Sequence, residues 1–244
     1  MSSIKTICFD FGNTRLKAAL FEGDVLTDTI VLPNDNDSTI IDLLDHHQPN
    51  KSILSSVVNH NTAIETILAD RTQYHQLTHL TEANFTTPVG SPQAIGADRL
   101  ALSAAAVHFF PNQNNLVISL GTCITYNFIN QYHQFIGGSI SPGMQMRFKA
   151  LQLFTAKLPE VAPVWNYPLL GYDTETNILS GVLAGMGFEI EGFIGATEAK
   201  YSNFNVVLTG GNTEHFAQRL KKRIFADQNF LFKGLYALSE INNT

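Results

Sequence analysis

The sequence has little charge, and its small excess of charge is acidic. Charged residues make up 15% of the 244 residues, and hydrophobic residues make up 44%. This balance is typical of a chain that buries a core, and it excludes an intrinsically disordered protein. The formal net charge of −6 argues against a sequence-independent nucleic-acid binder, because neutralising phosphates requires a basic face.

Cysteine clusters and long hydrophobic runs are also missing. The two cysteines, Cys8 and Cys123, are far apart in the sequence, which favours a reduced protein over a disulfide scaffold. The first residues lack the apolar core of a signal peptide. The most apolar stretch, 177–196, is interrupted by Glu189 and Glu191, whereas a membrane span needs about 20 mostly apolar residues. We therefore expect a cytoplasmic protein that binds neither membrane nor nucleic acid.

Two short segments share one pattern, CFDFGNT at 8–14 and ISLGTCIT at 118–125. In each, a glycine follows a short polar residue by two positions, Asp10 before Gly12 and Ser119 before Gly121. Glycine suits a tight turn between strands, and such a turn exposes backbone N–H groups that bind anions. Two copies predict two phosphate-binding hairpins that face each other across a cleft, as in an ATP-dependent phosphoryl transferase.

The predicted elements also occur twice in the same order. The first half has strands at 4–11, 15–21 and 25–31, followed by a short helix, strand 52–58, helix 62–69, strand 74–80 and helix 96–110. The second half has strands at 115–119, 123–129 and 134–140, a helix after 143, helix 174–200, strand 205–208, a helix capped by Thr213 and running to about 224, and a final strand and helix in 230–244. The pattern predicts an α/β protein of two duplicated domains, 1–113 and 114–244.

Three residues near the first turn and the following helix have side chains suited to chemistry. Asp10 is placed to hold Mg²⁺, directly or through water, although an aspartate can also cap its own turn. Asp98 could accept a proton from an attacking hydroxyl, and Arg99 could bind a carboxylate through two hydrogen bonds. The alternative is that Asp98 only stabilises the first turn of its helix and pairs with Arg99.

Glycines gather in three further places. The run 137–143 and the segment 209–212 would let the backbone approach a ligand closely, and the second would give adenosine a flat seat. Gly181, Gly185, Gly192 and Gly195 form a stripe on the predicted long helix. Since glycine costs about 1 kcal/mol in a helix interior, the stripe indicates close packing against another helix, within the subunit or across a dimer.

Taken in order, these segments resemble the type III pantothenate kinases of the actin-like and sugar-kinase (ribonuclease H-like) superfamily. The resemblance covers nearly the whole chain. It rests on the motifs DFGNTRLK at 10–17, GADR at 96–99, LGT at 120–122, the glycine run 137–143 with Arg147 beyond it, Leu158-Pro159, Thr174, and TGG at 209–211. The family implies two actin-like domains with a nucleotide cleft between them. It also implies ATP-dependent phosphorylation of pantothenate, the first step of coenzyme A synthesis, by a cytoplasmic homodimer that needs Mg²⁺ and a monovalent cation such as K⁺ or NH₄⁺.

The resemblance assigns roles to matching residues. It implies that Asp98 is the catalytic base, that Asp10 holds Mg²⁺, and that Thr174 contacts pantothenate across the dimer interface. ATP is expected to contact Asp10, Phe11, Gly12, Asn13, Thr14, Arg15, Leu16, Lys17, Thr122, Gly210 and Gly211. Pantothenate is expected to contact Gly96, Ala97, Asp98 and Arg99 as well as Thr174.

Two departures from the family pattern raise an alternative. Ser119 stands where the family usually has an aspartate that helps to bind the monovalent cation, so we expect weak or absent potassium dependence, or a site rebuilt from other oxygens. Val89 stands where the family tends to have a tyrosine, so one substrate contact is expected to be missing. The alternative is a degenerate homologue that binds nucleotide or pantothenate without turnover. A kinase for another hydroxylated substrate is a third possibility, because fold alone does not fix function.

Overall fold

The computed structural model describes residues 3–88 and 92–243, and the chain divides into two compact units. The first unit contains the residues up to Asn112, the segment Ile129–Gly137 and the residues from Asn229 onward. The second unit contains Gln113–Phe128 and Gly138–Gln228. Val89, which the sequence singled out, lies outside the described residues.

The first unit is built on a five-stranded sheet in the order β3-β2-β1-β4-β5. β1 pairs antiparallel with β2 and parallel with β4, and β4 pairs parallel with β5. The strands are β1 (Lys5–Phe11), β2 (Leu16–Glu22), β3 (Val25–Leu32), β4 (Lys51–Ser56) and β5 (Gln73–Gln76). The helices are α1 (Asp37–His47), α2 (Ala63–Arg71), α3 (Ala97–Phe109) and α8 (Phe230–Asn242).

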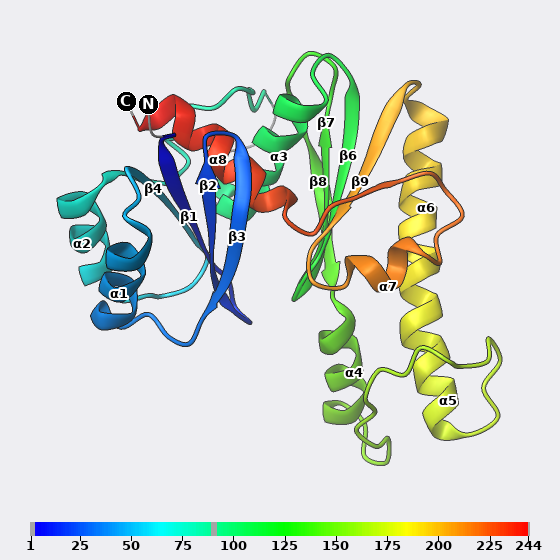
Figure 1. Cartoon of the computed structure of the whole chain (residues 1–244). Coiled ribbons are helices and arrows are strands. Elements are labelled where there is room, and N and C mark those ends of the chain that lie inside the picture. Colours follow the sequence, from blue (N-terminus) through cyan, green and yellow to red (C-terminus); the bar gives the residue numbers. More distant parts are fainter. Residues whose placement is uncertain (1–2, 89–91, 244) are drawn as a thin grey trace. The chain divides into compact units, whose positions relative to one another are not determined.

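Helices cover both faces of this sheet (Figure 1). Ile7, Phe9 and Phe11 of β1 share one core cluster with buried residues of α1 and α2. Side chains alternate along a strand, so Cys8 and Asp10 point to the other face. On that face α8 contacts β1 and β4, and α3 packs along α8. One face of β1 therefore packs with α1 and α2, and the other face packs with the layer formed by α8 and α3.

α3 and α8 approach so closely that one crossing point has no room for a side chain. Gly234 of α8 is buried, and a Cβ built on it would lie 2.6 Å from the carbonyl carbon of Ala101 in α3. Real Cβ atoms essentially never come so near. α3 carries the GADR motif at its start, so α8 fixes the helix that positions Asp98.

The second unit repeats the plan. Its five-stranded sheet has the order β10-β9-β6-β7-β8, and β9 runs parallel to both β6 and β10. The strands are β6 (Asn114–Leu120), β7 (Cys123–Ile129), β8 (Phe135–Pro142), β9 (Phe204–Thr209) and β10 (Phe225–Ala226). The helices are α4 (Met144–Leu153), α5 (Thr174–Leu179), α6 (Gly185–Lys200) and α7 (Thr213–Ala217), with a π-helical segment, Ser180–Ala184, joining α5 to α6. Matched strand by strand in chain order, the two sheets have the same arrangement, as a duplicated α/β fold requires.

α5, the π-helical segment and α6 form one continuous helix over Thr174–Lys200. Its length and composition alone are enough for a membrane span, and 44% of its most apolar window is buried inside the chain. Core helices of soluble proteins meet the same criterion. Glu189, in the middle of this helix, pairs with Arg147 of α4.

The structure corrects several sequence expectations. The C-terminal segment from Asn229 packs in the first unit, so the compact units differ from the predicted ranges 1–113 and 114–244. The strand expected within 230–244 is wrong: α8 occupies Phe230–Asn242, and β10 lies before it. α7 ends at Ala217 rather than near 224, and its N-cap residue is Asn212 rather than Thr213. β5 ends at Gln76, short of the expected 80.

Candidate active site

The first turn, residues 10–17, joins β1 to β2. Asp10 lies opposite Lys17 in the antiparallel register, and the Gly12 N–H donates to the Arg15 carbonyl at 3.1 Å. Neither Gly12 nor Gly121 has a positive φ. A Cβ on Gly12 would stand 3.4 Å from the Arg15 carbonyl oxygen, an ordinary van der Waals contact.

Asp10 and Asp98 are both partly buried in the first unit, and they lie close enough for the charge of one to affect the other. Burial, and secondarily the charge of Asp98, raise the pKa of Asp10 to about 6, against the opposing effect of Lys17. Burial also raises the pKa of Asp98, although hydrogen bonds from backbone N–H groups and the charge of Arg99 oppose that rise. A carboxyl group whose pKa is raised by burial and by a neighbouring carboxylate is typical of a functional site.

Arg99 has a partner that the sequence did not suggest. Its guanidinium carbon lies 5.4 Å from the centre of the Phe135 ring, at the start of β8. Burial lowers the pKa of Arg99 and the charge of Asp98 opposes this. The Phe135 N–H donates to the Thr86 carbonyl at 2.8 Å, and the Thr86 N–H donates to the His133 carbonyl at 2.9 Å. The loop before α3 is thereby tied to the strand that carries the ring.

In the second unit, three glycine motifs that are far apart in the sequence come together. The Gly143 N–H donates to the Thr122 carbonyl at 3.0 Å, and a Cβ on Gly143 would lie 2.8 Å from the Thr122 carbonyl carbon. Gly210 has a φ of +95°, and a Cβ there would lie 2.7 Å from the Leu120 carbonyl oxygen. The structure therefore brings the second turn, the end of the 137–143 run and the TGG motif into one place.

Arg147 and Glu189 form the centre of a partly buried polar network. Glu189 pairs with Arg147 and accepts hydrogen bonds from the hydroxyls of Ser141 and Tyr126, the latter at 3.0 Å. Burial alone would raise the pKa of Glu189, but hydrogen bonds from Ser141, Arg147 and Tyr126 outweigh it and hold that pKa low. In the sequence Glu189 stood out only as a charge that interrupts an apolar run. Its position on the long helix, beside the glycine stripe rather than on it, was the available signal that Glu189 has a partner within the unit.

The remaining predicted site residues occupy defined places in the second unit. Ser119 lies in register with Thr209 on the neighbouring strand, and the Thr209 hydroxyl is buried without a hydrogen-bond partner in the described chain. Thr174 is exposed at the start of α5, whose N-cap Asp173 forms a capping box with Thr176. Gly211 follows Gly210, and a Cβ on it would meet open space.

The geometry therefore describes a duplicated α/β protein with a glycine-lined turn in each unit and a buried pair of carboxyl groups in the first. The sequence pattern of the family "Type III pantothenate kinase" matches residues 6–196. The chain belongs to the type III pantothenate kinase family, and it is accordingly a kinase. The resemblance stated from the motifs is confirmed.

Relatives agree with this assignment, and solved structures share the fold. The type III pantothenate kinase of Cytophaga hutchinsonii is 41% identical, with 97% of this chain and 99% of that protein covered. The type III pantothenate kinase of Christiangramia forsetii is 38% identical, with 98% and 99% covered. A glucokinase from an Antarctic psychrotroph superimposes with a TM-score of 0.57 at 11% identity, covering 97% of this chain and 99% of that one. A putative Baf family transcriptional activator from Campylobacter jejuni superimposes with a TM-score of 0.62 at 20% identity, covering 97% and 98%. The structural likenesses confirm the predicted fold class.

The raised pKa of Asp10 leads to a prediction about stability. A carboxyl whose folded pKa lies above its unfolded pKa destabilises the folded state as the pH rises through the interval between them. For Asp10 this interval runs from 3.8 to about 6, which corresponds to at most about 3 kcal/mol. We expect Asp10→Asn to match the wild type in free energy of unfolding at pH 4 and to exceed it at pH 7.5 without divalent cations. Urea unfolding at both pH values measures the difference, and a constant difference would contradict the prediction.

Proposed function

We propose that this protein transfers the γ-phosphoryl group of ATP to the primary hydroxyl of pantothenate, the first step of coenzyme A synthesis in the cytoplasm. The observation that carries the proposal is the position of Asp98. It is a partly buried carboxyl at the start of α3, close enough to Asp10 of the first turn to raise that residue's pKa. Family membership supplies the substrate, since the relatives named above are pantothenate kinases.

Asp98 has the properties of a general base in this reaction. Its raised pKa makes it a better proton acceptor than an ordinary aspartate at neutral pH, and it would take the hydroxyl proton as the new P–O bond forms. Arg99 would bind the pantothenate carboxylate. The Phe135 ring packs against the guanidinium and restricts the motion of Arg99, so Arg99 loses less conformational entropy when the carboxylate binds.

The two turns would hold ATP. In the first unit, residues 10–17 would contact the phosphates through backbone N–H groups and Lys17. In the second unit, Thr122, Gly210 and Gly211 would contact the nucleotide, and the convergence of their backbones leaves a surface without side chains. Glycines there allow a ligand to approach the main chain closely.

Asp10 fits the role of a Mg²⁺ ligand. Its carboxyl is buried and disfavoured as an anion by Asp98, so a divalent cation would stabilise its charged form. Among residues 3–88 and 92–243, no three His, Cys, Asp or Glu side chains gather closely enough to form a metal site by themselves. Triphosphate oxygens and water would therefore complete the coordination, as is usual for Mg²⁺ in kinases. When bound, Mg²⁺ would offset the charge of the triphosphate.

Because position 119 is a serine, we expect a weaker requirement for a monovalent cation. A hydroxyl is a neutral and weaker ligand for a hard cation than a carboxylate. Thr209, its neighbour in register, offers a second hydroxyl that is buried and unpartnered within the described chain. These two oxygens make a weak K⁺ site at most.

A coupled assay of ADP release tests the function and the cation requirement together. We expect turnover with ATP, Mg²⁺ and pantothenate in both potassium and sodium buffers, and none without pantothenate. Turnover only in potassium would contradict the role given to Ser119 while leaving the kinase intact. Absence of turnover in either buffer, with ATP binding still seen by calorimetry, would contradict the kinase and favour a binding protein without catalysis.

The long helix supports a homodimer. Gly181, Gly185, Phe188, Gly192 and Gly195 follow one another at helical spacing, and Phe188 is 60% exposed. A Cβ added to any of these four glycines would meet open space, so the close packing that the stripe predicts is not made within the described subunit. Large exposed apolar residues on α4 and the following loop add to this uncovered surface: Leu153, Phe154, Leu169, Leu170 and Tyr172. We propose that a second copy covers this surface and that Thr174 completes the pantothenate site across the interface.

Sedimentation of the wild type and of Gly192→Leu measures the dimer. We expect the wild type to sediment at twice the mass of the 26.9 kDa chain. The variant is expected to sediment as a monomer, because a leucine would hold the two helices apart. Gly187→Leu lies on the same helix but off the stripe, and it should remain dimeric. A monomeric wild type, or loss of the dimer in both variants, would contradict the proposed interface.

A further inference from the structure

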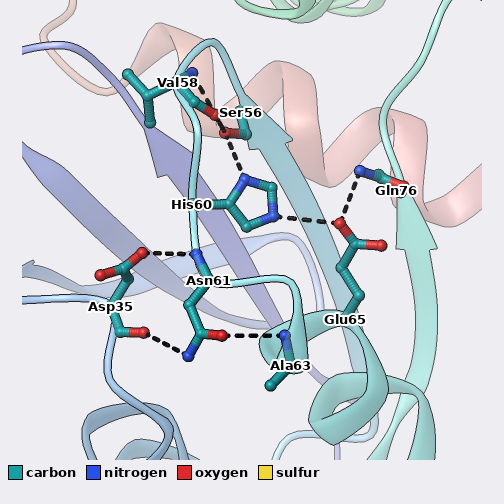
Figure 2. Close-up of polar contacts among 8 residues, drawn as sticks. All are labelled: Asp35, Ser56, Val58, His60, Asn61, Ala63, Glu65 and Gln76. Carbon is teal, nitrogen blue, oxygen red and sulfur yellow. Dashed lines mark hydrogen bonds and ion pairs between the residues drawn. The ribbon is translucent and has the colours of Figure 1, made fainter.

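A hydrogen-bonded histidine, His60, lies in the segment that joins β4 to α2, next to the end of β1 (Figure 2). His60 Nδ1 is 2.9 Å from the Ser56 hydroxyl, and Nε2 is 3.2 Å from Glu65 Oε1. Gln76 of β5 donates to the same Glu65 oxygen at 3.2 Å. The side chain of His60 is only 9% exposed. An imidazole bound at both nitrogens and buried has a fixed ring orientation.

The orientation of the Ser56 hydroxyl determines which of Ser56 and His60 donates the hydrogen bond between them. Its oxygen is 2.9 Å from the Val58 carbonyl and 3.4 Å from the Val58 N–H, but it has a single hydrogen to donate. If Ser56 donates to the Val58 carbonyl, His60 Nδ1 must carry a proton and donate to Ser56. If His60 Nδ1 is unprotonated, Ser56 must turn its hydrogen toward the ring. With the Ser56 hydroxyl donating to Nδ1, the neutral ring has its hydrogen on Nε2 and donates it to Glu65, so both nitrogens are hydrogen-bonded at once.

His60 contacts the residue that follows Asp10. Its ring meets the Phe11 ring edge to face, with centroids 5.7 Å apart and an interplanar angle of 77°. Ser56 lies beside Phe11 in the parallel register, and the Val57 N–H donates to the Phe11 carbonyl at 3.0 Å. The end of β1, where the first turn begins, is therefore held both through its backbone and through the Phe11 side chain.

This contact is on the face of the sheet away from Asp98. Phe11 belongs to the core cluster shared with α1 and α2, and alternation along β1 points Asp10 to the opposite face. His60 therefore lies on the side of the sheet that α3 and Asp98 do not occupy. Its effect on the reaction has to pass through Phe11.

The segment that carries His60 is also held by hydrogen bonds at its other end, and these restrict its motion. The Asn61 N–H donates to Asp35 Oδ2 at 2.8 Å, and the Asn61 side-chain amide donates to Asp37 Oδ1 at 2.6 Å (Figure 2 draws the Asp35 contact). Asn61 Oδ1 accepts from the Ala63 N–H at 3.1 Å, at the start of α2. These contacts tie the segment to the beginnings of both helices.

We propose that His60 is a positioning residue for ATP: braced by Ser56 and Glu65, it holds Phe11 and thereby sets Asp10 and Gly12 in the geometry that the triphosphate requires. The proposal rests on the proposed function, in which residues 10–17 bind the phosphates. Phosphoryl transfer depends mainly on positioning, so a small shift of this turn has a large kinetic effect.

Steady-state kinetics of His60→Ala test the proposal, with the two substrates varied separately. A displacement near the reacting groups costs up to about 100-fold in rate, and we expect the variant to lose on the order of 10-fold or more in kcat/KM for ATP. The KM for pantothenate should stay within a factor of about two, because Asp98 and Arg99 lie on α3 and do not depend on this contact. His60→Asn keeps an amide near the position of Nδ1 and should restore part of the loss.

His75→Ala is the matched control. His75 is a partly buried histidine of the same sheet, and its Nε2 lies 2.8 Å from the Thr81 hydroxyl, away from β1. It should leave the KM for ATP unchanged. If His60→Ala is too unstable to purify, His60→Asn and His60→Gln carry the comparison, since each keeps a different part of the imidazole's hydrogen bonding.

Three outcomes are separable. A folded His60→Ala with wild-type kcat/KM for ATP overturns the proposal. So does an equal rise in KM for both substrates, because that would mean general loosening of the unit. If Asp10→Asn also leaves ATP kinetics unchanged, the assignment of residues 10–17 to the phosphates fails instead, and with it the proposed function of that turn.

Discussion

Asp98→Asn is expected to lower kcat by about 10²–10⁴-fold, the usual contribution of a positioned base. Asparagine has nearly the same shape as aspartate but cannot accept the hydroxyl proton. The KM values should change little, because in the proposed function the two turns hold the triphosphate and Arg99 holds the pantothenate carboxylate. Stability should not fall, since the change removes a buried carboxyl that raises the pKa of Asp10. Steady-state kinetics with ATP and pantothenate measure the loss.

Asp70→Asn provides the control for this variant. Asp70 is exposed on α2 of the same unit, so the same chemical change there should leave kcat unaltered. Calorimetry shows whether Asp98→Asn still binds pantothenate. Full activity in Asp98→Asn would remove Asp98 from the role of base, and loss of pantothenate binding would make it a binding residue instead.

Gly234→Ala is expected to destabilise the protein by several kcal/mol, a large part of the 5–15 kcal/mol that stabilises a typical domain. Two effects oppose each other. Alanine is the better helix former by about 1 kcal/mol. Overpacking a tight core, however, costs about 1–3 kcal/mol or more, and here the added carbon would meet the backbone of Ala101 rather than a flexible side chain. The steric effect therefore prevails, and it would displace α3 together with Asp98.

Gly187→Ala adds the same methyl group at a position where we expect it to stabilise the protein rather than destabilise it. Gly187 lies inside α6, and a Cβ on it meets open space. We expect this variant to be as stable as the wild type or more stable, by up to about 1 kcal/mol. Urea unfolding of the two variants at one protein concentration makes the comparison. Equal effects from both substitutions would show that the α3–α8 crossing tolerates a methyl group.

Much of the fold could be predicted from local patterns. Apolar, β-prone runs bounded by turn signals located the first four strands and α1–α3 to within a few residues, because such local signals do not depend on contacts with distant segments. The GADR motif was correctly placed at the start of a helix, since Gly96 and Asp98 are typical of a helix beginning. The repetition of three strands in each half predicted the duplication.

The long-range contacts could not be read from the sequence. The stacking of Arg99 on Phe135 joins two segments through a strand pairing, and residue types alone do not reveal such pairings. Glu189 looked like a charge that interrupts an apolar helix, because its partners Arg147, Ser141 and Tyr126 come from three other elements. The sequence also placed the last helix by its position in the chain, whereas the packing of its Gly234 against Ala101 of α3 assigns it to the first unit.

That last contact has a consequence for how the chain folds as it is synthesised. α3 leaves the ribosome early, but α8, against which it packs, is made only after the whole second unit. Until then α3 lacks its main packing partner, and contacts between residues so distant in sequence form slowly. Chaperone dependence and proteolysis of nascent chains should therefore concentrate on α3. An interrupted chain that ends before α8 would carry both of the turns proposed to bind phosphate, but its Asp98 would not be held stably in place.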